Sequence, residues 1–465
     1  MNHILYSTED LSAILNAESF IQNKDILIRT ILSDSRKLSD INHSLFFALK
    51  ARRDGHSFIP AVYEEGLRSF VISDTEFDTG AYPDTNFYIV TDTLIALQDL
   101  AAAHRSKFNY PVIGITGSNG KTIVKEWLYQ LLVPESNIVR SPKSYNSQIG
   151  VPVSVWEMNE ENDLAIFEAG VSKEGEMENL ARIIRPTIGI LTNIGEAHST
   201  GFESLNDKIR EKLKLFEGVD LFIYSDKYLD QYDGEIPGTN KFTWNYRGQA
   251  NLEVFDDEVL EERFQFLRAR FNGKDVQAMI PFTDQASIEN AIICWASLLA
   301  LGYEPEEADK RLEKLIPVGM RLELKNGINN CSVIDDSYSL DLSSLAIALD
   351  FLKQQNQHQR RTLILSDIPG TDSEAVYEQV RNLLENKSVD RLIAVGEQIS
   401  KYAVDYPFET ECFVSTADFL EHFSSIKFHN ETILLKGARS FEFERISQLL
   451  TQKVHETVLE INLNA

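Results

Sequence analysis

The feature that most constrains the fold of this chain is the alternation of short apolar runs with longer amphipathic stretches. In the middle of the sequence the apolar runs are "VIGIT", "DLAIFEAG", "TIGILTNIG" and "DLFIYS", and helical patterns separate them. Runs that are apolar throughout are typical of parallel strands buried on both faces. The alternation therefore predicts an α/β protein with open parallel sheets, whose ligands bind at the carboxyl ends of the strands.

The pattern divides the 465 residues into three regions and a tail. Residues 1–107 contain short strand-like segments around the helical "FIPAVYEEG". Residues 108–317 begin at "YPVIGITG" and hold the four buried runs. Residues 318–453 again alternate strands such as "RTLILSD" with helices such as "DLSSLAIALDFLKQ". Residues 454–465 are a linker or the start of a further segment, so the length predicts a protein of several domains.

Composition excludes several classes of function. A formal net charge of −26 argues against a nucleic-acid-binding or anionic-membrane surface. No apolar run is long enough to span a bilayer, and the N-terminus lacks the pattern of a signal peptide. Three distant cysteines, Cys294, Cys331 and Cys412, disfavour a disulfide framework and a zinc site. We therefore expect a cytoplasmic protein without membrane insertion.

The segment "GSNG" lies between a predicted strand and the predicted helix "KTIVKEWLYQLL", which is the context of a phosphate-binding loop. Glycines let backbone N–H groups face an anion, and the helix N-terminus adds a positive dipole. Lys121 would reach the terminal phosphates and Thr122 would bind magnesium. The strict pattern requires glycine where Ile115 stands, so a tight turn before a surface helix is the alternative. The loop residues are Gly117, Ser118, Asn119 and Gly120.

Two further strand ends carry candidates for a metal site. Glu168 ends the run "DLAIFEAG", and His198 follows "TIGILTNIG". Magnesium prefers carboxylate and hydroxyl oxygens, and histidine is a less usual partner. A helix-capping carboxylate and a polar loop residue are the plain alternatives. Because both residues follow strands of one region, we expect a metal site there.

These motifs resemble those of the Mur ligases of peptidoglycan synthesis. "TGSNGKT", "YNSQIGVP", "FEAGVSKEGEM" and "TNIGEAHSTGFES" follow one another as in that family, and "GMRLE", "DDSYSLDLSSL" and "LLKGAR" come later. The segment "SDSRKLSDINHSLFFALKARRDGHSFIPAVYEEG" resembles the uridine-nucleotide-binding domain. The resemblance implies three domains: a small N-terminal α/β domain that binds the UDP-substrate, a central P-loop-type ATPase domain with a parallel sheet, and a C-terminal Rossmann-like ligase domain.

Within the family, the chain is most similar to the members that join D-Ala-D-Ala to UDP-N-acetylmuramoyl-tripeptide. The implied reaction uses ATP and Mg²⁺, forms an acyl phosphate on the tripeptide carboxylate, and ends when the dipeptide amine displaces phosphate. Three alternatives stay open. They are the ligase that adds the third amino acid, which usually shows "DYAH" where this chain has "DDSYS", a folylpolyglutamate synthase, and a catalytically silent nucleotide-binding partner.

The resemblance also implies residue roles around the phosphates. Lys121 contacts the β- and γ-phosphates, Thr122 and Glu168 hold one magnesium, and His198 lies at a second. Lys212 in "DKIREKLKLFEG" matches a lysine that carbon dioxide converts to a carbamate ligand of the second magnesium. The family glutamate near it is Lys214 here, and a solvated helix-surface lysine is the alternative.

Other implied roles concern the ends of the two substrates. Asn146 lies near the phosphates and the acyl substrate, and Asn290 meets adenine, although the preceding family residues are replaced by Ala286 and Ser287. Arg321 reaches ATP, and Asp336 and Tyr338 match neighbours of the ribose and phosphates.

Three positions after that motif, Ser339, Asp341 and Leu342, depart from the family pattern. Lys436 and Arg439 fall where the family contacts the peptide end. A surface ion pair, a turn and an ordinary strand-end lysine are the plain alternatives for these positions.

Two further segments complete the predictions. The uridine site is assigned to Ser35, Arg36, Asp54, Gly55 and His56, since an arginine suits a diphosphate, with a solvated loop as the alternative. The terminal "HETVLEINLNA" alternates as a strand does and resembles the opening strand of alanine racemase. We expect a ligase–racemase fusion, against the alternative of an incidental amphipathic tail.

Overall fold

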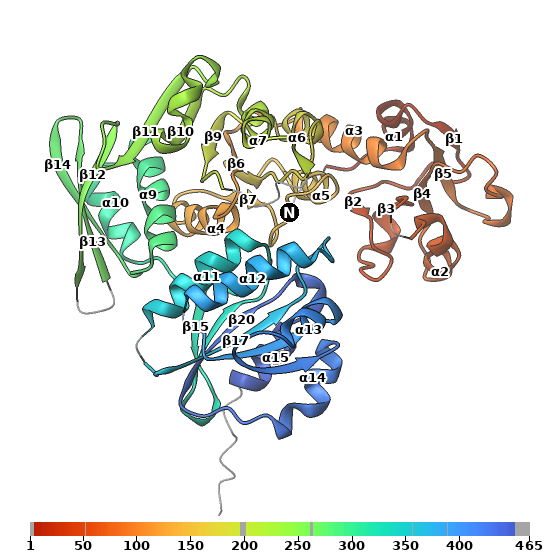
Figure 1. Ribbon diagram of the computed structural model, residues 1–465. Helices are drawn as coiled ribbons and strands as arrows, with labels where there is room; N and C mark the ends of the chain where they lie inside the picture. The colour runs from red at the N-terminus through yellow and green to blue at the C-terminus, as the bar shows by residue number, and fades with distance from the viewer. Residues whose placement is uncertain are drawn as a thin grey trace, which may run out of the picture. The chain divides into compact units, whose positions relative to one another are not determined.

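The computed structural model describes residues 4–51, 53–195, 201–260, 264–355, 357–387 and 389–451 (Figure 1). They form two compact units. The first comprises nearly all residues up to Leu315 and contains two sheets. The second runs from Ile316 onward, takes in the short segment Phe282–Ile288, and contains one sheet.

The N-terminal sheet has five strands, and all neighbours are parallel except the edge strand β1. Their spatial order is β1 (Glu18–Phe20), β5 (Asn86–Ile89), β4 (Ser69–Ile72), β3 (Ser44–Phe47), β2 (Thr30–Leu32). Side chains of β3 alternate between two cores. Leu45 and Phe47 join the core that includes α1 (Thr8–Leu15) and α3 (Thr93–Arg105). Phe46 joins the opposite core, which includes α2 (Ile59–Glu64).

The central sheet has nine strands and is parallel from β7 to β12, after which β13 and β14 turn back antiparallel. Their spatial order is β14 (Lys274–Ile280), β13 (Phe264–Phe271), β12 (Leu252–Leu260), β11 (Asn240–Tyr246), β10 (Leu221–Ser225), β9 (Ile188–Leu191), β6 (Val112–Thr116), β8 (Leu164–Glu168), β7 (Ile138–Arg140). After β6 the chain builds β7 and β8 on one side and then β9 on the other. This reversal makes the carboxyl end of β6 the switch point where such sheets bind ligands.

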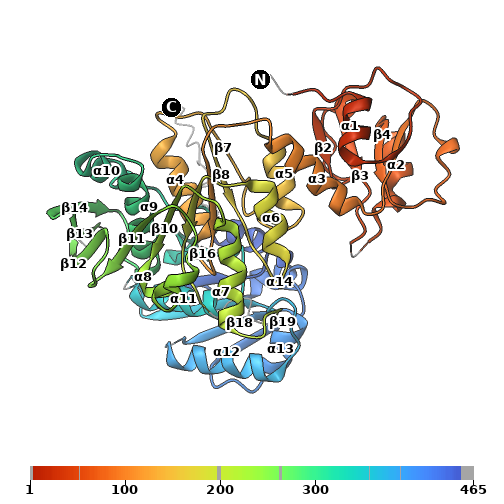
Figure 2. The same cartoon turned by 90° about the horizontal axis from the view of Figure 1, so that it is seen from above.

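Seven α-helices of the described residues accompany this sheet. They are α4 (Lys121–Leu132), α5 (Gly150–Trp156), α6 (Glu176–Ile184), α7 (Leu205–Leu213), α8 (Asp226–Leu229), α9 (Gln285–Ala300) and α10 (Pro305–Leu312). Leu180 of α6 and Ile209 of α7 pack in one core with Phe167 of β8. Figure 2 shows α10 beside the antiparallel strands at the far end of the sheet, where it packs on β14.

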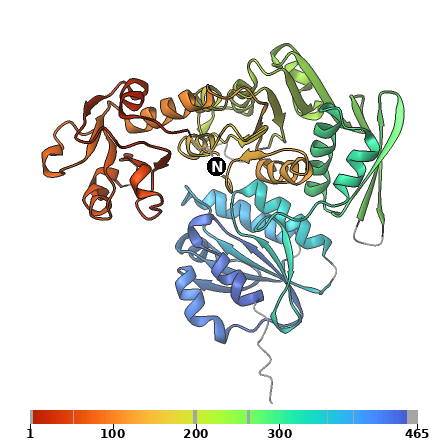
Figure 3. The same cartoon turned by 180° about the vertical axis from the view of Figure 1, so that it is seen from behind.

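The sheet of the second unit has six strands, of which only β15 is antiparallel to its neighbour. Their spatial order is β15 (Glu323–Asn326), β16 (Ser332–Asp336), β20 (Glu431–Lys436), β17 (Arg360–Ser366), β18 (Arg391–Val395), β19 (Glu409–Phe413). Leu363 and Leu365 pack with α11 (Leu342–Gln354), α12 (Glu374–Asn386) and α13 (Glu397–Ala403). Figure 3 shows α11 and α12 along one face of this sheet. Ile364 points to the other core, with α14 (Thr416–His422) and α15 (Glu444–Thr451).

The predicted α/β class is confirmed, and the four apolar runs of the central region are β8, β6, β9 and β10. The antiparallel extension β12–β14 and the three-residue strands were not predicted. Among the described residues, no helix combines the length and apolar composition needed to cross a bilayer. His198 and the terminal "HETVLEINLNA" lie outside the described residues.

Candidate active site

The predicted strand–loop–helix is present at the carboxyl end of β6. All five residues of β6 are buried, and α4 begins at Lys121 directly after the loop. Gly117 has φ 148° and Gly120 has φ 81°, conformations that side chains rarely adopt. A Cβ atom on Gly117 would also lie 2.0 Å from Thr192 Oγ1. The loop therefore needs both glycines, and it leaves the N-terminus of α4 facing the switch point.

The segment after β9 holds the loop in place. Asn193 accepts hydrogen bonds from the Ser118 N–H through its carbonyl and from the Asn119 N–H through Oδ1, both at 2.8 Å. The Thr192 hydroxyl donates to the Asn119 carbonyl at 2.5 Å. Lys121 Nζ donates to the carbonyls of Gly117 and Ser118, at 2.8 and 3.0 Å, so its ammonium group lies over the loop.

A group of oxygen atoms lies beside the loop, at the end of β8. Thr122 Oγ1 donates to Glu168 Oε2 at 2.8 Å, and it lies 2.8 Å from Ser144 Oγ. Because the single hydroxyl proton of Thr122 is used for Glu168, Ser144 donates to Thr122. Glu168 is completely buried. One carboxylate and two hydroxyls are oxygen donors of the kind that Mg²⁺ prefers, so the residues present fit a magnesium site.

Lysines of α7 lie under the same loop. Lys212 Nζ donates to the Gly117 carbonyl at 3.0 Å, and both Lys212 and Lys208 are buried. Burial, with further contributions from the charges of Lys121 and Lys208, holds the pKa of Lys212 well below its usual value. Lys212 is therefore not a solvated surface residue, and burial disfavours its charged form.

Two predicted asparagines also lie in this part of the first unit. The Asn146 carbonyl accepts a hydrogen bond from the Gly170 N–H at 2.8 Å, and its side chain packs against Gly170. Asn290, on α9, packs against Gly120: a Cβ atom there would lie 2.3 Å from Asn290 Oδ1. The structure thus places Asn290 beside the phosphate loop, and its adenine role stays a prediction.

In the second unit, Asp336 and Lys436 end the neighbouring parallel strands β16 and β20 and are paired in register. Lys436 Nζ donates to Asp336 Oδ2 at 2.6 Å, and both side chains are buried. Each buried charge thus has an opposite partner, as burial requires.

Two further predicted residues, Arg321 and Arg439, lie beside the aromatic ring of a third, Tyr338, in the second unit. The Arg321 guanidinium carbon lies 4.6 Å from the Tyr338 ring centroid, and that of Arg439 lies 6.0 Å from it. Arg321 also donates to Ser339 Oγ at 2.8 Å. These residues form a cationic cluster beside the ends of β16 and β20.

The predicted "RRDGH" residues hold a turn together. Asp54 Oδ1 accepts hydrogen bonds from the His56 N–H at 3.0 Å and from His56 Nδ1 at 2.6 Å, while His56 Nε2 accepts from the Ser73 N–H. The histidine bond lowers the pKa of Asp54. A Cβ atom on Gly55 would lie 2.6 Å from the Leu49 nitrogen.

The other predicted uridine residues are Ser35 and Arg36. Arg36 forms a two-point ion pair with Asp34, in which both N–O distances are 2.9 Å. The next residue, Lys37, reaches the Tyr145 hydroxyl at 3.2 Å, next to Asn146. Residues 35–37 therefore lie close to the loop of the central region that follows β7.

Sequence reasoning missed Ser144, Asn193, Lys208 and Lys37. Asn193 follows a predicted strand within the quoted "TNIG", so its position at a strand end was a usable signal. Ser144 follows β7, which has only three residues and is too short to recognise from its pattern. Lys208 and Lys37 lie in charged segments that give no signal of burial or contact.

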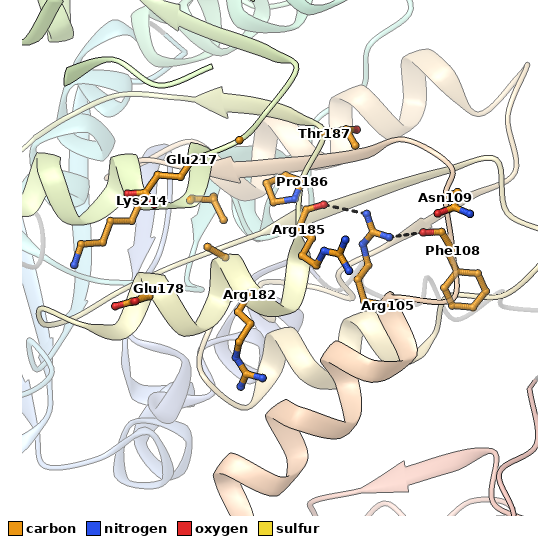
Figure 4. A pocket seen from close by; sticks show the side chains of 13 residues that line it. Arg105, Phe108, Asn109, Glu178, Arg182, Arg185, Pro186, Thr187, Lys214 and Glu217 are labelled. Atoms are coloured by element: carbon orange, nitrogen blue, oxygen red, sulfur yellow. Dashed lines mark hydrogen bonds between the residues drawn. The ribbon is translucent and has the colours of Figure 1, made fainter. Parts of the chain in front are cut away.

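A cleft of about 590 Å³ opens elsewhere, at the amino ends of β6, β9 and β10 (Figure 4). Basic and acidic residues line it, and Arg105 and Arg182 among them have partners within the protein. Arg105 donates to the carbonyls of Ile184, Phe108 and Arg185, and Arg182 pairs with Asp99 at 2.7 Å. Because ligands of parallel sheets bind at the opposite, carboxyl edge, this cleft is not the candidate active site.

Comparison with known proteins identifies the central part of the chain. Residues 115–298 match the Mur ligase middle domain. Over 441 residues the chain is 29% identical to the UDP-N-acetylmuramoyl-tripeptide–D-alanyl-D-alanine ligase of Bacillus subtilis (strain 168). The alignment covers 91% of this chain and 93% of that enzyme.

Solved structures show the same fold. MurF from Acinetobacter baumannii superposes with a TM-score of 0.80 at 23% identity, covering 97% of this chain and 100% of that one. MurF from Thermotoga maritima in complex with ADP gives 0.73 at 18% identity, covering 92% and 98%. The predicted three-domain Mur ligase fold, with its small N-terminal α/β domain, central P-loop-type domain and C-terminal Rossmann-like domain, is confirmed.

Proposed function

The chain is a Mur ligase, and we propose that it joins D-Ala-D-Ala to UDP-N-acetylmuramoyl-tripeptide at the expense of ATP. The similarity to the Bacillus subtilis ligase over nearly the whole of both chains supports this choice of substrates. The observation that carries the proposal is the loop 117–122, where glycine backbone, helix N-terminus and Lys121 converge. We assign residues 1–107 to UDP-substrate binding, 108–317 to ATP binding, 318–453 to the ligase domain, and the reaction to the cytoplasm.

The reaction activates the tripeptide carboxylate, which is a poor electrophile by itself. A carboxylate oxygen of the tripeptide attacks the γ-phosphorus of ATP, and the bond to the β-phosphate oxygen breaks, which yields an acyl phosphate and ADP. The dipeptide amine then attacks the acyl carbon, phosphate leaves, and the nitrogen loses a proton. Backbone N–H groups of the loop and Lys121 would hold the phosphates while charge moves between them.

We propose that Thr122 and Glu168 hold a magnesium ion, because their oxygens and that of Ser144 lie together beside the loop. When bound, Mg²⁺ would neutralise charge on the phosphates in transfer. Glu168 is buried and would keep its carboxylate directed at one place. His198, outside the described residues, stays a prediction for the second metal.

We further propose that Lys212 carries a carbamate. Burial lowers the pKa of Lys212, which disfavours its charged form, and the neutral amine is the form that attacks carbon dioxide. The amine nitrogen attacks the carbon of carbon dioxide, a C=O electron pair moves to oxygen, and a proton leaves to solvent. The resulting anion would lie near the ammonium groups of Lys121 and Lys208, which favour a negative charge.

The remaining roles that the family resemblance implies are proposals too. For the acyl substrate and the nucleotide they concern Asn146, Asn290, Arg321, Asp336 and Tyr338. For the uridine nucleotide and the peptide they concern Ser35, Arg36, Asp54, Gly55, His56, Lys436 and Arg439.

The test is a phosphate-release assay with ATP and Mg²⁺ that crosses two acceptors with two amines. We expect release only with UDP-muramoyl-tripeptide and D-Ala-D-Ala together. Release with the dipeptide acceptor and a single amino acid would instead indicate the ligase that adds the third residue. Nucleotide binding without any release would indicate a silent partner.

A variant of Lys121 tests whether the loop 117–122 holds the transferred phosphate. Lys121→Ala should raise the activation barrier by about 3 kcal/mol or more, since it removes a charge aimed at the phosphoryl group. The exposed Lys310→Ala, on α10, is the matched control. Near-normal turnover of Lys121→Ala would show that the loop does not hold the transferred phosphate.

A further inference from the structure

Lys125, one helical turn after Lys121 on α4, is a completely buried lysine that the proposed chemistry does not use. Its Nζ donates to the Ser141 carbonyl at 2.6 Å and to the Lys143 carbonyl. It also lies 3.1 Å from Glu126 Oε1 and 3.9 Å from Glu168 Oε1. A buried ammonium group is costly unless its surroundings compensate it, and these four oxygens do so.

The contact with Glu168 bears on the orientation of that carboxylate. Glu168 Oε2 accepts the Thr122 hydroxyl on one side, and Oε1 lies toward Lys125 on the other. A carboxylate with an opposite charge near one oxygen and a hydrogen bond on the other is fixed in rotation about its last bond. Lys125 thus helps to fix the plane of the Glu168 carboxylate beside Thr122.

The contacts with Ser141 and Lys143 bear on the loop after β7. Lys143 has φ 51°, a left-handed conformation that is unfavourable for a residue with a Cβ atom. Its carbonyl is turned toward the Lys125 ammonium group, which offsets that cost. The next residue, Ser144, reaches the Thr122 hydroxyl. The bonds of Lys125 therefore set where this loop places its side chains.

We propose that Lys125 is a positioning residue of the ligase: one buried ammonium group fixes both the Glu168 carboxylate and the loop Ser141–Asn146. It acts through these groups, because a fully buried side chain does not reach substrate. The proposal rests on the proposed function only for its kinetic readout. Its structural content concerns the geometry of the candidate metal site.

The neighbouring Glu126 offers a matched control. Glu126 Oε2 pairs with Arg140 Nε at 3.0 Å, and its Oε1 contacts Lys125. It is on the same helix, is mostly buried, and has no hydrogen bond to Glu168 or to Ser144 among those described. Glu126→Gln therefore perturbs the charge network of Lys125 without removing the contacts that position the site.

The test compares Lys125→Met and Lys125→Gln with Glu126→Gln and the parent protein. Electron paramagnetic resonance measures Mn²⁺ binding in the presence of ADP, kinetics give kcat and KM, and thermal unfolding gives the midpoint temperature. We expect both Lys125 variants to weaken Mn²⁺ binding at least fivefold and kcat at least tenfold. In the Lys125 variants, KM for D-Ala-D-Ala should stay within twofold of the parent. In Glu126→Gln, Mn²⁺ affinity and kcat should both stay within twofold of the parent.

Each other outcome contradicts either the positioning role of Lys125 or the proposed function. If the Lys125 variants lose only thermal stability and keep Mn²⁺ affinity and kcat within twofold, the role is structural and the proposal fails. If neither variant folds, Lys125 belongs to folding and the proposal fails as well. If the parent shows no ligase activity but its Mn²⁺ binding depends on Lys125, the proposed function fails while the positioning role stands.

Discussion

Thr122 and Glu168 form a 2.8 Å hydrogen bond across two neighbouring strands of the central sheet. Glu168 is the last residue of β8, where it pairs in register with Ile115 of β6. Thr122 is the second residue of α4, which begins a few residues after β6 ends. The adjacency of β6 and β8 thus brings a helix-start hydroxyl onto a buried strand-end carboxylate.

Removal of the Thr122 hydroxyl tests this relationship. Thr122→Val keeps the shape of the side chain but leaves Glu168 Oε2 without its donor and removes a proposed magnesium ligand. We expect the barrier to rise by about 3 kcal/mol, which corresponds to roughly a hundredfold loss of kcat. Thr122→Ser, which keeps the hydroxyl, should stay close to the parent. Equal activity of the two variants in steady-state assays would remove the hydroxyl from the reaction.

Lys212 should carry a carbon-13 label from bicarbonate. NMR of the protein in ¹³C-bicarbonate should show a carbamate signal in the parent, and none in Lys212→Ala. The half-exposed Lys214→Ala, which loses only an ion pair with Glu211, is the control and should keep the signal. Activity of Lys212→Ala should be strongly reduced and partly restored by acetate, whose carboxylate replaces the missing anion. An unchanged carbamate signal in Lys212→Ala would assign the modification to another lysine.

A double-mutant cycle measures how much the buried pair Asp336–Lys436 contributes to the free energy of unfolding, independently of any role in peptide binding. Lys436→Met leaves Asp336 buried without its cation, and we expect it to lower the free energy of unfolding by about 3 kcal/mol or more. Asp336→Leu combined with Lys436→Met should recover most of that loss, because no charge stays buried. Chemical denaturation measures the four proteins. A double variant as unstable as Lys436→Met would show that the loss of stability does not come from an unpaired Asp336 charge.

Asp309 gives a pH-dependent prediction at the antiparallel end of the central sheet. Burial raises its pKa above 3.8, although it accepts a hydrogen bond from the Met279 N–H at 2.8 Å. Between pH 3.8 and the folded-state pKa the folded protein binds more protons than the unfolded one, so stability falls as the pH rises. Asp309→Asn keeps the acceptor and removes the charge.

We therefore expect Asp309→Asn to raise the thermal midpoint at pH 7 and to have little effect below about pH 3.8. Asp309→Ala, which lacks the acceptor, separates the charge from the hydrogen bond. A midpoint of Asp309→Asn that does not exceed the parent at neutral pH would show that the partly buried charge of Asp309 does not destabilise the fold.

The sequence by itself determined the features that depend on neighbouring residues. The apolar runs became β6, β8, β9 and β10, and "GSNGKT" became a glycine-dependent loop at a helix start, because burial on both faces and positive φ angles leave local signatures. The ordered motifs indicated the Mur ligase family, since they extend over most of the chain. Short strands such as β7 and the charged hairpin strands β13 and β14 carry too little pattern to be recognised.

Only the tertiary structure decided which side chains meet. The order of strands places Asn193 on the loop and Ser144 on Thr122, and no local pattern specifies that order. The run "DKIREKLKLFEG" does not show which of its lysines is solvated, yet packing of α7 buries Lys208 and Lys212. Burial is a property of everything that packs against a residue, and so is the pKa shift that follows from it. The amine of Lys212 therefore acquires its chemistry from contacts distant in the sequence.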